Sequence, residues 1–336
     1  MWMMQRMVYD YYGLYMVEMF QAGRYSGFYT QDKTYVFVPE NQEDSSLWEE
    51  KLQWAQMMRQ TDQTIARFVP PLQKNLSITV DGEKQMLFEL SIQEKQDDRE
   101  EYSGAELAIF HNKGSALFPN ASPDMFVQRW SQWWEIRLEQ LENWYHSVKT
   151  KSVYSQMDRW FIRTFPYYLG LTENAMQWLK AIPANERVEE AGCICHFRYT
   201  PAAWVTIAPH TLPNKLPSDW LYDHPTRDVA EWIRYAMEQD ASGQELETFV
   251  HSYEQHKSIT SFGWDLIAGR LLFPYYYLEQ MEQTYLRENL GNMEEILYNL
   301  EQSWQKEGNR LEQLASLKQS FPDAFRNSPD WLISES

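Results

Sequence analysis

A change in hydrophobic periodicity near residue 93 constrains the fold more than any other feature of this sequence. Before it, "GRYSGFYT", "KTYVFVPE" and "LSITVDGEKQMLFELSI" have the pattern of β-strands and hairpins, and one helical pattern occurs in "SSLWEEKLQWAQMMRQ". After the charged run "QEKQDDREE", apolar residues recur at helical spacing. This order predicts an α+β chain with a β-rich N-terminal lobe at 1–92, a hinge or connector at 93–103 and a helical C-terminal lobe at 104–336.

The second part of the chain is expected to be mostly helical. A long helix should begin at Ser122-Pro123, because proline favours the first helical position. Short strands are expected in "CICHFRY" and "WVTIA". The remaining periodicity predicts two shorter helices near 155–168 and 172–182, then helices over 263–290 and 293–321.

Charge and cysteine content limit the kinds of partner and ligand that we expect this chain to bind. The chain has 48 acidic and 30 basic residues, a formal net charge of −18, so we expect it to bind no nucleic acid. Arg6 and Asp10 interrupt the apolar N-terminus, and we expect neither a signal peptide nor membrane insertion. Cys193 and Cys195 fall on one face of an expected strand, and we interpret them as small buried residues without a disulfide or a metal.

Several motifs carry a resemblance to a known family. "GAELAIFHNKG" resembles the helix after the hinge in aminoglycoside-phosphotransferase-like proteins, "CHFRYTPAAW" their catalytic loop, and "WLYDHPTRDVAEWIR" their metal-binding segment. With "RFVPPL", "TFPYYLGLTENA" and "RLLFPYYYLEQ", the chain resembles the CotS group of kinase-like spore-coat proteins. The resemblance implies a two-lobed protein-kinase-like fold, synthesis in the mother-cell cytoplasm, a place in the spore coat, and other spore coat proteins as partners.

The residues that phosphoryl transfer needs are missing from the matching positions. Aligned on His196 and Pro201, the Asp that orients the acceptor hydroxyl falls on Arg198, which cannot accept a proton at neutral pH. The metal-binding Asn falls on Ala203, which has no ligand atom. The phosphate-holding Lys falls on or near Val38. A positioned general base alone contributes ~10²–10⁴ in rate, so transfer by the family's mechanism should be negligible.

At two other positions of the family's motifs the sequence keeps an aspartate. Asp223 falls at the metal position, and we expect Arg198 or another nearby basic or N–H group to pair with it in place of an ion. Asp228 is expected to be a structural anchor that accepts hydrogen bonds from the loop backbone. We interpret His196 as a packing residue. The pair of Asp223 and His224 lacks further ligands, so no metal site is expected.

These residues favour a non-catalytic, kinase-like (pseudokinase) structural or interaction protein of the bacterial endospore coat, without a cofactor. Two alternatives stay open. One is an active phosphotransferase that acts on a small hydroxylated molecule or a coat protein. The other is a sensor that binds a nucleotide or metabolite without turnover.

Overall fold

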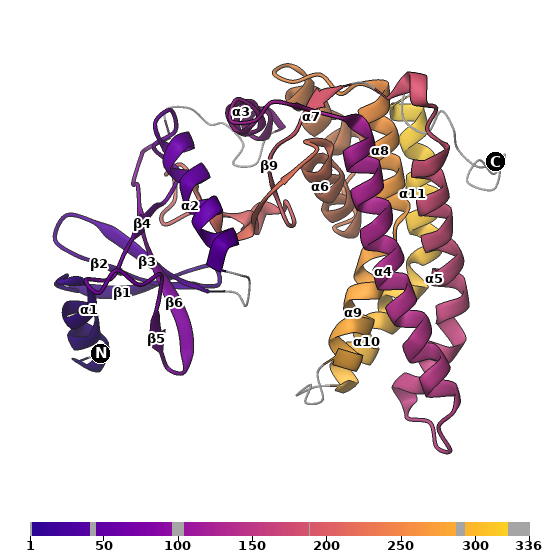
Figure 1. The fold of residues 1–336 in the computed structure, drawn as a ribbon, viewed down its shortest axis with the longest axis horizontal. Helices are drawn as coiled ribbons and strands as arrows, with labels where there is room; N and C mark the ends of the chain where they lie inside the picture. The colour runs from indigo at the N-terminus through magenta and orange to yellow at the C-terminus, as the bar shows by residue number, and fades with distance from the viewer. Residues whose placement is uncertain (1, 41–44, 96–103, 188, 287–292, 322–336) are drawn as a thin grey trace. The chain divides into compact units, whose positions relative to one another are not determined.

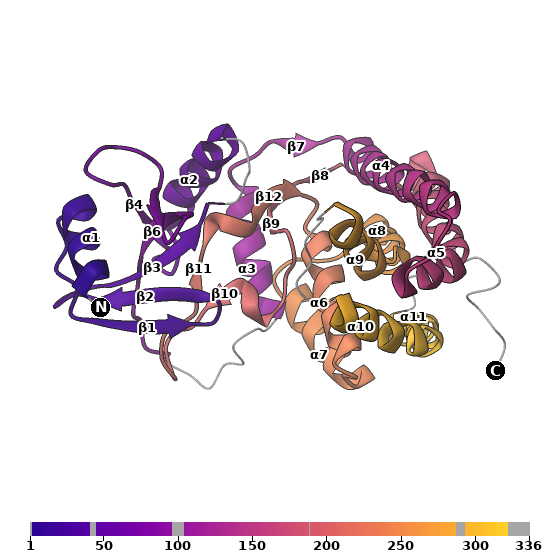
Figure 2. The same ribbon diagram turned by 90° about the horizontal axis from the view of Figure 1, so that it is seen from below.

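The computed structural model describes residues 2–40, 45–95, 104–187, 189–286 and 293–321 (Figures 1 and 2). The chain forms two compact units. Unit 1 comprises Met1–Pro119, Gly192–Asp228 and His251–Lys257, and unit 2 comprises Asn120–Ala191, Val229–Val250 and Ser258–Ser336. Segments from the predicted helical lobe therefore group with the β-rich part of the chain, and most of the predicted connector at 93–103 lies outside the described residues.

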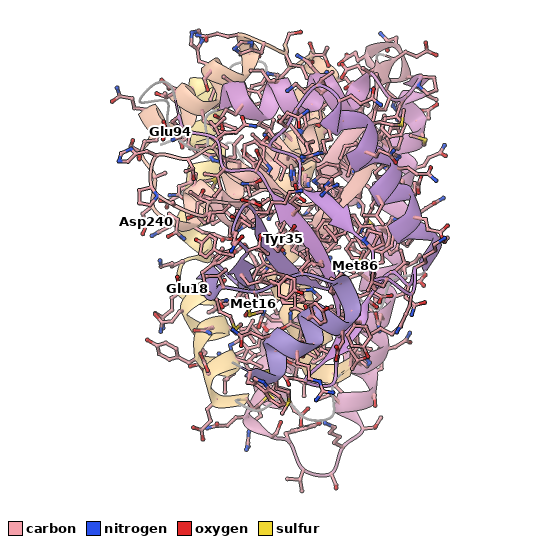
Figure 3. All side chains as sticks on the ribbon, turned by 90° about the vertical axis from the view of Figure 1, so that its left-hand side faces the viewer. Met16, Glu18, Tyr35, Met86, Glu94 and Asp240 are labelled. Carbon is pink, nitrogen blue, oxygen red and sulfur yellow. The ribbon has the colours of Figure 1, made fainter. Side chains whose placement is uncertain are left out.

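Unit 1 contains a six-stranded antiparallel sheet with strand order β1-β2-β3-β6-β4, in which β5 also pairs with β6. The predicted hairpin between β5 and β6 turns at Asp81 and Gly82, whose φ angles of 51° and 89° fit a two-residue type I′ turn. Val38 of β3 pairs with Met86 of β6, the neighbouring strand (Met86 and Tyr35 of β3 are labelled in Figure 3). The strands are β1 (Glu18–Ala22), β2 (Tyr25–Tyr29), β3 (Thr34–Pro39), β4 (Arg67–Val69), β5 (Ile78–Val80) and β6 (Glu83–Leu90).

Strand β3 is buried on both faces of this sheet. Tyr35 and Phe37 pack in a hydrophobic cluster with residues of α1 (Trp2–Tyr12). Val36 and Val38 point to the other face and pack in a second cluster with Trp48 of α2 (Ser45–Arg59). Alternate side chains of a strand face opposite sides of the sheet, so one uninterrupted apolar strand serves two cores.

The rest of unit 1 carries the segment "CHFRYTPAAW", residues 195–204, which resembles a kinase catalytic loop and is called the kinase-like loop below. Strands β9 and β12 pair antiparallel, and so do β10 and β11. Helix α3 packs on β9 at Gly114, where an added Cβ would lie 3.0 Å from the backbone nitrogen of Ile194. The elements are α3 (Gly104–Ser115), β9 (Cys193–His196), the 3-10 turn η2 (Pro201–Ala203), β10 (Trp204–Val205), β11 (Asn214–Lys215), η3 (Pro217–Asp219) and β12 (Trp220–Asp223).

Unit 2 is mainly helical, and its long helices α4 and α5 run side by side (Figures 1 and 2). Helices α6 and α7 have residues in both units. The helices are α4 (Pro123–Lys149), α5 (Gln156–Ala181), α6 (Thr226–Glu238), α7 (Gly243–Glu254), α8 (Ser261–Leu272), α9 (Tyr275–Leu286), α10 (Met293–Gln305) and α11 (Glu307–Ser320). The short elements are β7 (Asn120–Ala121), β8 (Glu190–Ala191) and η1 (Ala184–Glu186). No described helix is both long and apolar enough to cross a membrane.

Three helix predictions were wrong. The pair expected at 155–168 and 172–182 is one helix, α5, which continues through Pro166. Buried residues recur at helical spacing on both sides of Pro166, and their packing offsets the backbone hydrogen bond that proline cannot donate. The helix expected at 263–290 is instead divided into α8 and α9 at Pro274, and the one at 293–321 into α10 and α11 at Lys306.

Candidate functional site

Two paired strands position the kinase-like loop of unit 1. His196 ends β9 and Asp223 ends β12, and the antiparallel register pairs His196 with Trp220 and Asp223 with Cys193. The loop after His196 holds Arg198, which is partly buried, and Ala203 at the end of η2. The loop after Asp223 leads into the first turn of α6, where Asp228 lies. Arg198, Ala203, Asp223 and Asp228 thus belong to two adjacent chain segments.

Asp228 is the hub of a buried hydrogen-bond network. It is fully buried, and its carboxylate accepts bonds from the backbone N–H of His196 at 2.9 and 3.1 Å and from the Nδ1 of His196 at 2.7 Å. Nε2 of His111 lies 3.1 Å from the same carboxylate. Burial alone would raise the pKa of Asp228, but the interactions with His196 and His111 hold it well below its usual range. The carboxylate therefore joins the loop to α3 and α6.

Both histidines of this network have defined hydrogen-bond roles. Trp204 can only donate through its indole N–H, which lies 3.0 Å from Nε2 of His196, so His196 accepts there and donates to Asp228 through Nδ1. His111 donates to Asp228 through Nε2 and accepts at Nδ1 from the hydroxyl of Tyr253, 2.9 Å away. Burial lowers the pKa of His111, which favours this neutral form. Trp204 thus engages the lone pair on Nε2 of His196, the atom that a general base would use.

Asp223 is held by groups of its own chain. Its Oδ2 accepts a hydrogen bond from Nη1 of Arg227 at 2.9 Å, and its Oδ1 accepts one from the backbone N–H of His224 at 2.8 Å. The guanidinium of Arg227 also donates to the carbonyls of His196 and Phe197. Arg227 is the site residue that sequence analysis missed, and its spacing of four residues from Asp223 at a helix start was the available signal.

The position where the resemblance places the phosphate-holding lysine, on or near Val38, lies in a hydrophobic core. Val38 is 1% exposed and belongs to a cluster that extends from Trp48 of α2 to Val205 of β10 and Leu216 beside β11. No residue of β3 is a lysine. Apolar side chains from the sheet and from the loop-bearing segment thus pack in one continuous cluster.

Polar contacts hold the turn between β1 and β2 against the segment around η3. Arg24 forms an ion pair with Asp219 at 2.7 Å, and the hydroxyl of Tyr25 lies 3.4 Å from that of Ser218. Lys51 of α2 is buried and donates to the carbonyl of Ser218 at 3.0 Å. In the kinase fold implied by the sequence, the turn between the first two strands covers the nucleotide phosphates. Here the same turn is bonded to the chain itself.

These residues do not fit a magnesium ion that holds a nucleotide. A metal ion would compete with Arg227 for Asp223, and Ala203 offers no second ligand. Elsewhere in unit 1, ligand atoms of His111, Cys193 and Cys195 lie within 4.8 Å of one another. Both ring nitrogens of His111 already have hydrogen-bond partners, and burial raises the pKa of the Cys195 thiol, so a metal there would have to displace existing bonds.

Comparison with known proteins identifies the family. The family model described as "Spore coat putative kinase YutH" matches residues 5–317. The chain is also 32% identical, over 269 residues, to the endospore coat-associated protein YutH of Bacillus subtilis (strain 168). The alignment covers 78% of this chain and 77% of that protein.

Solved structures show the fold. An aminoglycoside phosphotransferase from Alicyclobacillus acidocaldarius superimposes with a TM-score of 0.63 and 14% identity, covering 90% of this chain and 92% of the other. A spectinomycin phosphotransferase gives a TM-score of 0.53 and 11% identity, covering 88% of this chain and 91% of the other. These similarities confirm the predicted aminoglycoside-phosphotransferase-like fold. The family match over residues 5–317 and the 32% identity to the Bacillus subtilis protein lead to one conclusion: the chain belongs to the YutH family of kinase-like spore-coat proteins.

Proposed function

We propose that this protein is a non-catalytic, kinase-like structural or interaction protein associated with the bacterial endospore coat. Membership of the YutH family, and similarity to a protein named as endospore coat-associated, support the location. The observation that carries the non-catalytic part is the state of Asp223, whose two oxygens are bonded to Arg227 and His224. A guanidinium four residues away supplies the positive charge that a metal ion supplies in an active kinase.

Three further features support the same conclusion. Phosphoryl transfer needs a group that orients the acceptor hydroxyl, and Arg198 at that position carries a permanent positive charge. The position of the phosphate-holding lysine falls on or near Val38, within a hydrophobic cluster, and Arg24 and Tyr25 bond the turn between β1 and β2 to the segment around η3. Such a fold serves as a scaffold, and its partners would be other coat proteins that recognise an acidic surface.

Calorimetry with Mg²⁺ and ATP tests the proposal. The parent protein should give no measurable heat of binding, and release of phosphate from ATP should stay at the level of buffer. Micromolar binding with turnover, both lost in an Asp223→Asn variant that keeps the circular dichroism of the parent, would show an active phosphotransferase. Binding that raises the melting temperature without turnover would show a nucleotide sensor.

The coat location needs a separate experiment. A tagged copy produced from the native promoter should be recovered in the coat fraction extracted from purified spores. Recovery in the spore core fraction would contradict this part of the proposal, whatever the nucleotide experiment shows.

A further inference from the structure

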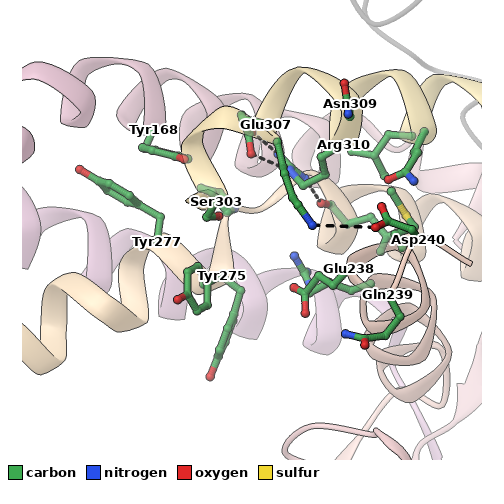
Figure 4. Close-up of a pocket in the computed structure, with 18 of the residues that line it drawn as sticks. Tyr168, Glu238, Gln239, Asp240, Tyr275, Tyr277, Ser303, Glu307, Asn309 and Arg310 are labelled. Atoms are coloured by element: carbon green, nitrogen blue, oxygen red, sulfur yellow. Dashed lines mark hydrogen bonds and ion pairs between the residues drawn. The ribbon is translucent and has the colours of Figure 1, made fainter. Parts of the chain in front are cut away.

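A cavity of about 700 Å³ lies within unit 2, among α5, α6, α8, α9, α10 and α11 (Figure 4). Its size is in the range of small-molecule sites, roughly 300–1,000 Å³. Tyr168, Leu271 and Tyr277 line it and are buried, and the rings of Tyr168 and Tyr277 stack with centroids 3.7 Å apart. No residue of the kinase-like loop lines this cavity, so its chemistry is independent of the function proposed above.

One wall of the cavity is negative. Glu238 and Asp240 line it at the C-terminal end of α6, and both side chains are exposed. Arg234 also lines this wall, but its guanidinium donates to the carbonyls of Arg270 and Phe273 at the end of α8. Two carboxylates of this wall therefore face one arginine, whose guanidinium bonds backbone oxygens and lies 3.7 Å from the carboxylate of Glu231. The partial negative charge of the α6 C-terminus has the same sign.

The opposite wall is positive. Lys306 and Arg310 line it against one carboxylate, Glu307. Arg310 donates to Glu307 through Nε at 3.0 Å and through Nη2 at 2.6 Å, and to the carbonyl of Leu271 through Nη1 at 2.9 Å. Glu307 accepts a further bond from the hydroxyl of Tyr167 at 3.1 Å. These contacts fix the guanidinium in place, and the ammonium of Lys306 remains as the excess charge of this wall.

A weak ion pair joins the two walls. Nζ of Lys306 lies 3.9 Å from Oδ2 of Asp240, as the dashed line in Figure 4 marks, and these side chains are 64% and 78% exposed. Exposed ion pairs contribute little to stability because water solvates both charges. A ligand that offers a better partner to each group can therefore replace this contact.

We propose that the cavity binds a zwitterion, specifically a short peptide with free termini. Its ammonium group would contact Asp240 and its carboxylate Lys306, so that two ion pairs replace one. An apolar side chain between the two termini would pack against the buried lining residues Leu271 and Tyr277. A ligand with a single charge would satisfy only one wall, and a cavity of about 700 Å³ holds more than a single amino acid.

Matched peptides test this proposal by isothermal titration calorimetry on the full chain. The probes are the tripeptides Ala-Leu-Ala and Ala-Tyr-Ala, each with free termini, with an acetylated N-terminus, or with an amidated C-terminus. The free peptides should bind, and each blocking group should weaken binding roughly two- to fivefold, the range expected for one exposed ion pair. Equal affinity for all three forms, or no binding by any of them, would overturn the proposal.

Two substitutions assign the charges to the walls. Asp240→Asn should weaken binding of the free peptide roughly two- to fivefold but leave the N-acetylated peptide unchanged, and Lys306→Met should spare the amidated peptide in the same way. Asp10→Asn is the matched control, because Asp10 forms a similarly exposed ion pair with Arg6 on α1. All three residues are mostly exposed, so the variants should melt like the parent. Parent-like affinity of both cavity variants for the free peptide would refute the assignment.

Discussion

Replacing Asp228 with Ala should destabilise the protein by about 3–5 kcal/mol. The substitution leaves three buried N–H donors without their acceptor, two on His196 and one on His111. An unsatisfied buried polar group costs ~1–3 kcal/mol, so the simple sum is roughly 3–9 kcal/mol. Water that enters the space of the lost carboxylate, and relief from burying a charge, reduce this sum. These two effects leave the expected cost in the lower part of that sum, at about 3–5 kcal/mol.

Urea denaturation followed by tryptophan fluorescence and circular dichroism measures this cost. Asp124→Ala is the matched control, because Asp124 also lies in the first turn of a helix but is 53% exposed and pairs with Arg187. It should cost at most about 1 kcal/mol. Asp228→Asn should fall between the two, since it keeps one acceptor oxygen but turns an amide N–H₂ toward a donor. An Asp228→Ala midpoint equal to that of the parent would refute the anchor role.

Other substitutions give results of defined sign. Burial alone would raise the pKa of Asp62, but Lys215 and the hydrogen bonds of Thr64 lower it to about 2. Its contribution, up to roughly 2 kcal/mol, is complete above the unfolded pKa of about 3.9 and is lost as the pH falls toward 2. Asp62→Asn should therefore flatten the fall in unfolding free energy between about pH 5 and pH 2. An unchanged slope would contradict this. Gly192→Ala should lower the melting temperature, because its Cβ would lie 2.4 Å from the ring of Tyr222. Gly170→Ala in α5 meets no atom within 4 Å and should raise it; equal shifts for the two would contradict the packing argument. Arg227→Met should lower the urea midpoint, because it leaves the carboxylate of Asp223 buried without its cation; a parent-like midpoint would show that the ion pair is dispensable.

Several features were predictable because they depend on local chemistry. The turn at Asp81 and Gly82 requires two residues with positive φ, and this dipeptide supplies them between strand patterns. The expected losses at Arg198 and Ala203 rest on the family resemblance and on residue type, since no packing gives alanine a ligand atom. The alternation of β-rich and helical segments indicated the fold class, because strand and helix periods differ in any environment.

Tertiary structure decided what depends on contacts between distant residues. The roles of the two ring nitrogens of His196 follow from Trp204 and Asp228, which arrive from different elements. Continuation of α5 through Pro166 depends on the neighbours of its buried face, which outweigh a local signal for a break. The cavity of unit 2 brings Asp240 and Lys306 together across 66 residues, and no sequence periodicity encodes that distance. Sequence by itself therefore determined which residue types stand at the motif positions, whereas three-dimensional packing determined which groups contact one another there, because hydrogen bonds and ion pairs depend on distances of a few ångströms.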